Sequence, residues 1–194
     1  MKAVSREARD LGQAGDPPAA LDFPAVYRQH FAYVFRTLRR LGVRPSELND
    51  ATQETFTVVL RRLGDYDPQR PIEPWLFGIA FRVAAALRRR RARRIIEVFS
   101  RTDEVADDDS LGPESSFADR QARGLVLAGL EALNLDRRAV FVMHDIDGQS
   151  VPEIARTLDV PLNTVYSRLR VARAEFFARI QKLRRRRGDN GGEP

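Results

Sequence analysis

The sequence predicts an all-α protein in which two small helical domains are joined by a flexible acidic linker and the C-terminal domain is a helix-turn-helix. Apolar residues recur every three or four positions along most of the chain, which is typical of amphipathic helices. We find no segment of useful length with the alternation expected of a β-strand. Residues 97–116 are rich in acidic side chains and show little periodicity, so we interpret them as a solvated linker.

The first predicted helix follows a leader, residues 1–20, whose glycine, proline and aspartate content predicts disorder. Its apolar side chains have helical spacing: Phe23, Val26, Tyr27, Phe31, Val34, Leu38 and Leu41. Gly42 then stands where a helix commonly ends, because glycine adopts the left-handed backbone conformation without strain. This helix opens the first predicted domain, residues 21–96.

The second predicted helix follows Pro45 and Ser46 and has two distinct faces. Its apolar stripe is Phe56, Val59, Leu60 and Leu63. Its other face carries four polar residues: Asp50, Gln53, Glu54 and Thr57. The apolar stripe is expected to face the domain core, which leaves the polar face for solvent or for a partner.

A loop over residues 64–73 is expected next, because three prolines at positions 68, 71 and 74 interrupt a continuous helix. Pro74 is well placed to begin the third helix. One apolar stripe runs along that helix: Trp75, Leu76, Ile79, Ala80, Val83 and Leu87. The helix ends in an arginine run within residues 88–94, which closes the first domain.

The most specific local pattern lies at residues 150–173, inside a second domain predicted over residues 117–183. Ser150 and Glu153 fit a capping box, in which the serine accepts a bond from a first-turn amide and the glutamate reaches back. A short helix follows and breaks at Asp159, an aspartate in place of the more usual turn glycine that still tolerates the left-handed conformation.

A longer helix then begins at Leu162 and has two faces. Its apolar side is Leu162, Val165, Leu169, Ala172 and Phe176. Its outward side is Asn163, Thr164, Tyr166, Ser167, Arg168, Arg170 and Arg173. A short helix, a tight turn and a longer polar helix describe a helix-turn-helix, whose second helix fits the major groove of DNA. The alternative is an ordinary helical hairpin with a solvated basic face. Residues 184–194 are expected to form a disordered basic and glycine-rich tail.

The charge balance is consistent with a polyanionic partner. There are 33 basic and 27 acidic residues, for a net charge of +6, and a basic protein gains affinity for nucleic acid through counterion release. Genome base content offers a second explanation, since Lys2 and Lys182 are the only lysines. No apolar run is long enough for a membrane span or a signal peptide, and there is no cysteine, so we expect no membrane insertion and a cytoplasmic protein.

The sequence gives little support for an enzyme. It has no phosphate-binding glycine loop, and its two histidines, His30 and His144, lie far apart within amphipathic helices. The acidic residues 107–109 lie in the linker, where a solvated charge run is a better interpretation than a metal site. We therefore expect no catalytic residues, no metal and no cofactor.

Taken together, the motifs resemble the extracytoplasmic-function (ECF) group of bacterial RNA polymerase sigma factors. The polar string at residues 50–56 is similar to the second-helix motif of that group. Residues 75–80, followed by arginines, resemble its third-helix motif. Residues 148–155 and 164–174 resemble its helix-turn-helix. These motifs occur in the expected order around an acidic linker.

The resemblance implies a sigma region 2 domain that binds core RNA polymerase and the minus-10 promoter element. Asp50, Gln53 and Glu54, with Thr57 on the same face, match the surface that docks on the clamp helices of the polymerase's largest subunit. The loop around Tyr66 matches the segment that captures a flipped base; an ordinary packing role for this tyrosine is the alternative. The residues implied at the minus-10 element are Tyr66, Trp75, Arg82, Arg88, Arg89 and Arg90, although for Trp75 we favour a bracing role in the core.

The resemblance also implies a sigma region 4 domain that reads the minus-35 element with the outward face of its last helix. By chemistry, Asn163 prefers adenine and an arginine prefers guanine, whereas the other side chains suit phosphates. Tyr166 stands where a lysine or arginine is common, and Ala86 and Phe81 also depart from the usual pattern, which suggests an unusual promoter preference.

The partners implied are core RNA polymerase, promoter DNA and an anti-sigma factor, and the free protein is expected to be monomeric. Two other functions fit a helix-turn-helix chain of this size. A classical repressor or activator would dimerise and bind duplex DNA without polymerase, and a helical adaptor would bind only protein. Neither requires the string at residues 50–56 coupled to Trp75.

Overall fold

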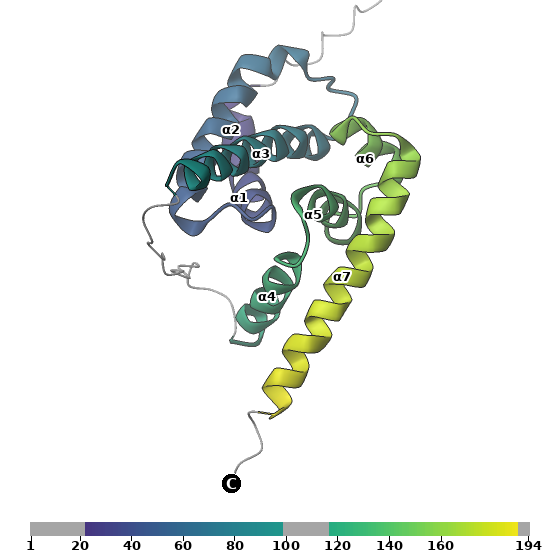
Figure 1. Cartoon of the computed structure of the whole chain (residues 1–194). Coiled ribbons are helices and arrows are strands. Elements are labelled where there is room, and N and C mark those ends of the chain that lie inside the picture. The colour runs from purple at the N-terminus through teal and green to yellow at the C-terminus, as the bar shows by residue number, and fades with distance from the viewer. Residues whose placement is uncertain (1–21, 99–116, 190–194) are drawn as a thin grey trace, which may run out of the picture.

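The computed structural model describes residues 22–98 and 117–189, and every regular element in these two ranges is helical (Figure 1). The helices form an N-terminal domain, α1–α3, and a C-terminal domain, α4–α7, which confirms the predicted all-α class. The predicted leader, most of the acidic linker and the end of the predicted tail lie outside the described residues. Within the described ranges, no helix has the length and apolar character needed to cross a membrane.

The N-terminal domain is a bundle of three helices, α1 (Phe23–Arg40), α2 (Leu48–Arg62) and α3 (Ile72–Val98), each packed against the other two. Short 3-10 turns at Pro45–Glu47 and Leu63–Asp65 lie at the two ends of α2. The three helices share an apolar core that includes Val26, Val34, Leu38, Leu48, Phe56, Val59, Leu76, Phe77 and Ala80.

The first helix ends where the sequence predicts. Gly42 has a φ of 84°, in the left-handed region. Its amide donates to the carbonyl of Arg39 at 3.0 Å, and the next amide, that of Val43, donates to the carbonyl of Leu38 at 3.1 Å. These bonds satisfy carbonyls that the end of the helix leaves free.

Three helix boundaries differ from the predicted ones, and one of them is the end of α3, which lies at Val98 rather than in the arginine run at residues 88–94. Helix α3 begins at Ile72, so Pro74 lies in its first turn rather than at its start; first-turn amides have no helical partner, and a proline there breaks no bond. The last helix continues to Asp189, so residues 184–189, predicted as part of a disordered tail, are helical. Arginine is a good helix former and basic residues suit a helix C-terminus, which favours this extension.

The C-terminal domain is built on one long helix, α7 (Leu162–Asp189), seen as the yellow-green helix in Figure 1. The other helices, α4 (Phe117–Leu130), α5 (Leu135–Phe141) and α6 (Val151–Leu158), all pack against it, and a π-helical turn, Val142–Ile146, extends α5. The core of this domain includes Leu130, Leu133, Val140, Val142, Met143, Ile154, Val165, Leu169, Ala172 and Phe176.

The start of α6 has half of the predicted capping box. The Ser150 hydroxyl accepts a hydrogen bond from the Glu153 amide at 3.4 Å, as predicted. The Glu153 carboxylate instead contacts the Arg156 guanidinium, three residues further along the helix. An opposite charge one turn away thus replaces the reciprocal bond to the serine amide.

The two domains touch each other. Helix α6 lies against α3, near the end of α3 at which that helix begins (Figure 1). The first helix of the predicted DNA-reading motif is therefore packed on the helix that follows the predicted base-capturing loop.

Candidate nucleic-acid and polymerase interfaces

Helices α6 and α7 form the predicted helix-turn-helix. Asp159, in the turn, has a φ of 55°, the left-handed conformation that the break in the sequence pattern predicts. Val165 and Leu169 of α7 are buried with Ile154 of α6. Leu162 departs from the predicted apolar side: as the first residue of α7 it lies beyond the buried stripe and is 47% exposed.

The outward face of α7 holds all the residues predicted to read the minus-35 element. Five of them are exposed: Asn163, Tyr166, Ser167, Arg170 and Arg173. Thr164 and Arg168 are half-buried. Across the described residues Arg170 has no hydrogen bond or ion pair, so its guanidinium is available to a ligand.

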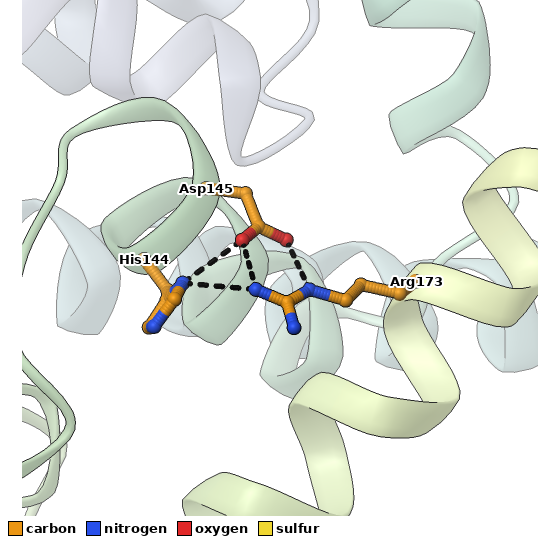
Figure 2. A network of polar contacts seen from close by, with 3 residues as sticks. All are labelled: His144, Asp145 and Arg173. Carbon is orange, nitrogen blue, oxygen red and sulfur yellow. Dashed lines mark hydrogen bonds and ion pairs between the residues drawn. The ribbon is translucent and has the colours of Figure 1, made fainter.

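Arg173 differs from Arg170 because it is already engaged by acidic and imidazole groups of the same domain (Figure 2). Its guanidinium donates to both carboxylate oxygens of Asp145, with N–O distances of 2.9 and 2.5 Å. The Nδ1 atom of His144 lies 2.8 Å from that carboxylate and 3.2 Å from the guanidinium. The hydrogen bond from Arg173 lowers the pKa of Asp145, which keeps the carboxylate ionised.

Two further ion pairs hold α7 against α5. The Arg137 guanidinium lies 2.6 Å from the Glu175 carboxylate, and that of Arg168 lies 3.1 Å from the Asp136 carboxylate. With the Arg173 pair, they join residues that are 28 to 38 positions apart. Nothing in local spacing indicates such pairs, and sequence reasoning missed them. They fix the orientation of α7, and they engage two of the arginines predicted to contact DNA.

A groove with an aromatic floor lies between α1 and α2 in the N-terminal domain. Its volume is about 390 Å³, and it is lined by Phe23, Tyr27, Phe31, Asn49, Gln53, Phe56, Thr57 and Leu60. The ring centroids of Tyr27 and Phe56 are 4.7 Å apart. Leu60 was expected in the core but is 55% exposed, because it lies on the groove side of α2.

The residues predicted to bind core polymerase lie in or near this groove on α2. Gln53 and Thr57 line it, and Asp50 is exposed one turn before Gln53. Glu54 is half-buried, and its carboxylate lies 3.9 Å from the Arg90 guanidinium of α3. The sequence pattern found the polar residues of this surface but assigned the exposed Leu60 to the core; Phe56, from the same predicted stripe, is buried as expected.

Tyr66 and Trp75, both predicted at the minus-10 element, form an aromatic pair at the start of α3. Their ring centroids are 5.3 Å apart at an interplanar angle of 51°. Both side chains are half-buried. The Tyr66 hydroxyl donates to the carbonyl of Arg70, and the amide of Gln69 donates to the Asp67 carboxylate at 3.0 Å, so the loop is held in shape by its own bonds.

The arginines predicted at the minus-10 element are spread along α3. Arg82 is exposed, and its guanidinium donates to the carbonyl of Gly78 at 2.9 Å. The run of Arg88, Arg89 and Arg90 is also exposed. It begins thirteen positions after Trp75, or about 20 Å along the helix. The aromatic pair and the arginine run are thus two separate parts of one α3 surface.

Comparison with known proteins gives both domains a family. Residues 26–94 match the family model for sigma-70 region 2, and residues 123–176 match the model for sigma-70 region 4. These segments correspond to the α1–α3 bundle and to the main part of the α4–α7 bundle.

Individual relatives agree with these matches. The chain is 33% identical to the ECF RNA polymerase sigma factor SigE of Mycolicibacterium smegmatis, over 84% of this chain and 63% of that relative. It is 30% identical to the RNA polymerase sigma factor NccH of Alcaligenes xylosoxydans xylosoxydans, over 82% of this chain and 87% of that relative.

A solved structure extends the likeness to the fold. In a structure of CnrH in complex with the cytosolic domain of CnrY, CnrH aligns with 80% of this chain and 85% of its own chain, with a TM-score of 0.54 and 27% identity. CnrH is an RNA polymerase sigma factor of Cupriavidus metallidurans. Two region models match in the predicted order, and the chain covers 87% of NccH at 30% identity. Together with the likeness to the ECF sigma factor SigE, this shows that the chain belongs to the sigma-70 family, within its ECF group.

Proposed function

We propose that this sigma factor binds core RNA polymerase through the α1–α2 groove, contacts the minus-10 element with the start of α3 and the minus-35 element with α7, and assists promoter melting. The observation that carries the proposal is the aromatic groove of the N-terminal domain. An aromatic groove with polar residues on its rim is typical of a surface that another protein covers.

The groove supplies both parts of a protein interface. Tyr27, Phe31 and Leu60 are 40%, 37% and 55% exposed, and together they offer apolar area to a partner. Gln53 and Thr57 place polar groups at the rim. Exposed aromatic side chains in a pocket are frequent hot spots of binding energy, and the polar rim fixes the register of the partner.

The aromatic pair at the start of α3 suits a base that has left the DNA stack. An unpaired base loses stacking energy, and an aromatic side chain replaces about 1–3 kcal/mol of it. Tyr66 can offer a ring face because its hydroxyl is tied to the loop carbonyl of Arg70 while much of the residue faces solvent. The Trp75 ring packs against the Tyr66 ring and helps to hold it in place. Melting then needs no hydrolysis, since binding of the open strand offsets the cost of opening.

The minus-35 contacts are assigned to the first three turns of α7. Asn163 and Arg170 are exposed and carry groups that pair with base edges, adenine and guanine respectively. Arg168 and Arg173 are tied to Asp136 and Asp145 and are better suited to orienting the helix or to approaching phosphates. Tyr166, 59% exposed, offers an apolar ring in place of a charge.

We also propose that the free protein is a monomer and that an anti-sigma factor inhibits it. Support comes from the family and from the CnrH structure, in which that sigma factor is bound to the cytosolic domain of CnrY. A protein inhibitor would need to cover the groove or the DNA-binding faces to be effective.

Direct binding to purified core RNA polymerase tests the role of the groove. The Leu60→Glu substitution places a charge among apolar groove side chains and should weaken the affinity of the full chain by roughly tenfold or more. Arg62→Ala is the matched control, because Arg62 is exposed on the same helix outside the groove and pairs only with Asp65 in the described structure. Equal affinities for both variants and the unmodified protein would remove the groove from the interface.

A further inference from the structure

Helix α5 and its π-helical extension present two acidic side chains to the DNA-reading helix α7. Asp136, in the first turn of α5, lies 3.1 Å from the guanidinium of Arg168. Asp145, in the π-helical turn at the other end of α5, accepts hydrogen bonds of 2.9 and 2.5 Å from the guanidinium of Arg173 (Figure 2). Two arginines of α7 are therefore engaged by acids of a single neighbouring element.

The two engaged arginines lie at the edges of the outward face of α7. A helix turns by about 100° per residue, so Arg168 and Arg173, five positions apart, point about 140° apart around its axis. Buried residues such as Val165 occupy this narrow arc. Asn163 and Arg170 lie on the wider arc, which faces outward, and Arg170 has no ion pair among the described residues. The outward face thus has a centre that is free to bind and edges that are already paired.

The acids reduce the attraction of these edges for DNA. Sequence-independent affinity grows with the number of cations that reach phosphates, because each contact releases about 0.9 counterion. An arginine that already donates to a carboxylate must exchange one anion for another, and the carboxylate itself repels the DNA backbone. The Arg168 and Arg173 side chains are 25% and 44% exposed, so both could turn toward a phosphate if their acids were absent.

Phosphate contacts at the edges and base contacts at the centre have different effects on the choice of sequence. A phosphate is present at every nucleotide, so an unpaired flexible arginine finds a partner in any register of α7 on the duplex. The pattern of base edges read by Asn163 and Arg170 is correct in one register only. Two unpaired edge arginines would therefore stabilise binding to incorrect sequences more than binding to the correct one, where the central residues already fix the helix.

We propose that Asp136 and Asp145 are specificity-determining residues. They hold the two edge arginines of α7 in ion pairs, so that the choice of DNA depends on the central residues Asn163 and Arg170. The proposal rests on the proposed function, because it uses the assignment of α7 to the minus-35 element. Neither acid has to contact DNA, since each acts through the arginine that it holds.

Binding of the holoenzyme, core RNA polymerase with the full chain, to two duplexes tests the proposal. One duplex carries the minus-35 and minus-10 elements identified by transcription of a pooled promoter library. The other has a scrambled minus-35 element and is otherwise identical. Contacts made by core polymerase and by the N-terminal domain are common to both duplexes. The discrimination ratio, the affinity for the intact duplex divided by that for the scrambled one, therefore reports on α7.

The full-length Asp136→Asn, Asp145→Asn variant should discriminate less than the unmodified chain. Its affinity for the scrambled duplex should rise by roughly threefold or more at low salt, and its discrimination ratio should fall by roughly threefold or more. Each arginine that is released to a phosphate should also steepen the slope of log affinity against log salt by about 0.9. A loss of stability alone would not raise the affinity for the scrambled duplex.

Glu175→Gln is the matched control. The Glu175 carboxylate of α7 lies 2.6 Å from the guanidinium of Arg137. This substitution removes the same charge and the same kind of ion pair between α5 and α7, but the arginine that it releases belongs to α5 and not to the DNA-reading helix. The discrimination ratio of this variant should stay within about twofold of the unmodified value.

An Arg173→Gln background separates the release of the arginine from the loss of the acid. In that background Asp145→Asn has no arginine to release, so it should change neither the salt slope nor the discrimination ratio. An unchanged ratio and slope in the double asparagine variant, or the same change in Glu175→Gln, would overturn the proposal and leave the assignment of α7 intact. Equal binding of both duplexes by the unmodified holoenzyme would instead overturn the assignment of α7 to the minus-35 element, and this proposal with it.

Discussion

The arginines of the C-terminal domain are of two kinds, and the difference is set by single acidic residues. Arg170 is unpaired within the described residues, whereas Arg168 and Arg173 are held by Asp136 and Asp145. Sequence patterns place all three on the outward face of one helix but cannot distinguish them. Their partners come from a segment about thirty positions earlier, and that proximity exists only after folding.

The ion pair between Asp145 and Arg173 should make a pH-dependent contribution to the free energy of unfolding. Asp145→Asn should lower the free energy of unfolding at pH 7 by about 1 kcal/mol, because the charged bond to Arg173 is lost. Arg173 lowers the folded-state pKa of Asp145, so the contribution is fully present above the unfolded pKa of about 3.9. It is lost as the pH falls through the lower folded pKa. Urea unfolding of both proteins between pH 7 and pH 3 measures this.

The matched control is Asp136→Asn, whose carboxylate is 53% exposed beside Arg168. An exposed pair contributes little, so its effect should stay within about 0.5 kcal/mol. A difference between Asp145→Asn and the unmodified protein that does not shrink on acidification would contradict the role given to the charge.

Two substitutions of Tyr66 distinguish the contribution of its ring to base stacking from the contribution of its hydroxyl hydrogen bond. Tyr66→Phe keeps the ring beside Trp75 and loses only the bond to the Arg70 carbonyl. Tyr66→Ala loses the stacking surface, so formation of the melted promoter complex should fall by roughly tenfold. Permanganate reactivity of unpaired thymines in the minus-10 region measures melting. Equal melting by the Ala variant and the unmodified protein would exclude base stacking on Tyr66.

At the scale of elements, the helices were predictable because their signals are local. The apolar stripes, the glycine after α1 and the left-handed turn at Asp159 all depend on neighbours within one or two helical turns. The exposed groove was not predictable, since Leu60 and Phe56 have the same apolar character and differ only in what packs above them. Likewise, no sequence pattern indicates that Gly129 in α4 is a close-packing position, although α7 packs directly over it.

Substitution of Gly129 by alanine should therefore change the stability in the direction opposite to the one that helix propensity predicts. A Cβ atom at this position would lie 2.5 Å from the Phe176 ring and 2.8 Å from Ile180. Gly129→Ala should destabilise the domain by about 1–3 kcal/mol through overpacking, despite the better helix propensity of alanine. Thermal and urea unfolding measure the change.

Gly124, in the same helix, is the control because a Cβ atom there would meet nothing within 4 Å. Gly124→Ala should be neutral or stabilise by up to about 1 kcal/mol. If both alanine substitutions have the same effect, the close packing of α4 on α7 at Gly129 is wrong.

At the scale of the whole molecule, the order of motifs predicted the family, but the contact between the domains was not predictable. Region 2 and region 4 matches occur in the predicted order. The pairing of Arg40 with Asp147 joins positions 107 residues apart, and no spacing rule connects them. The sequence motifs thus predict the family of each domain, but they do not predict which residues of the two domains contact each other.

The most direct test of the central claim, that the chain is a promoter-recognising sigma factor, is run-off transcription with core RNA polymerase on a pooled promoter library. We expect new transcripts that start downstream of shared minus-35 and minus-10 elements only when the protein is present, and we expect them to disappear with Leu60→Glu but not with Arg62→Ala. An active core that gives no new transcripts, together with tight binding of the protein alone to duplex DNA, would contradict a sigma-factor function and favour a repressor.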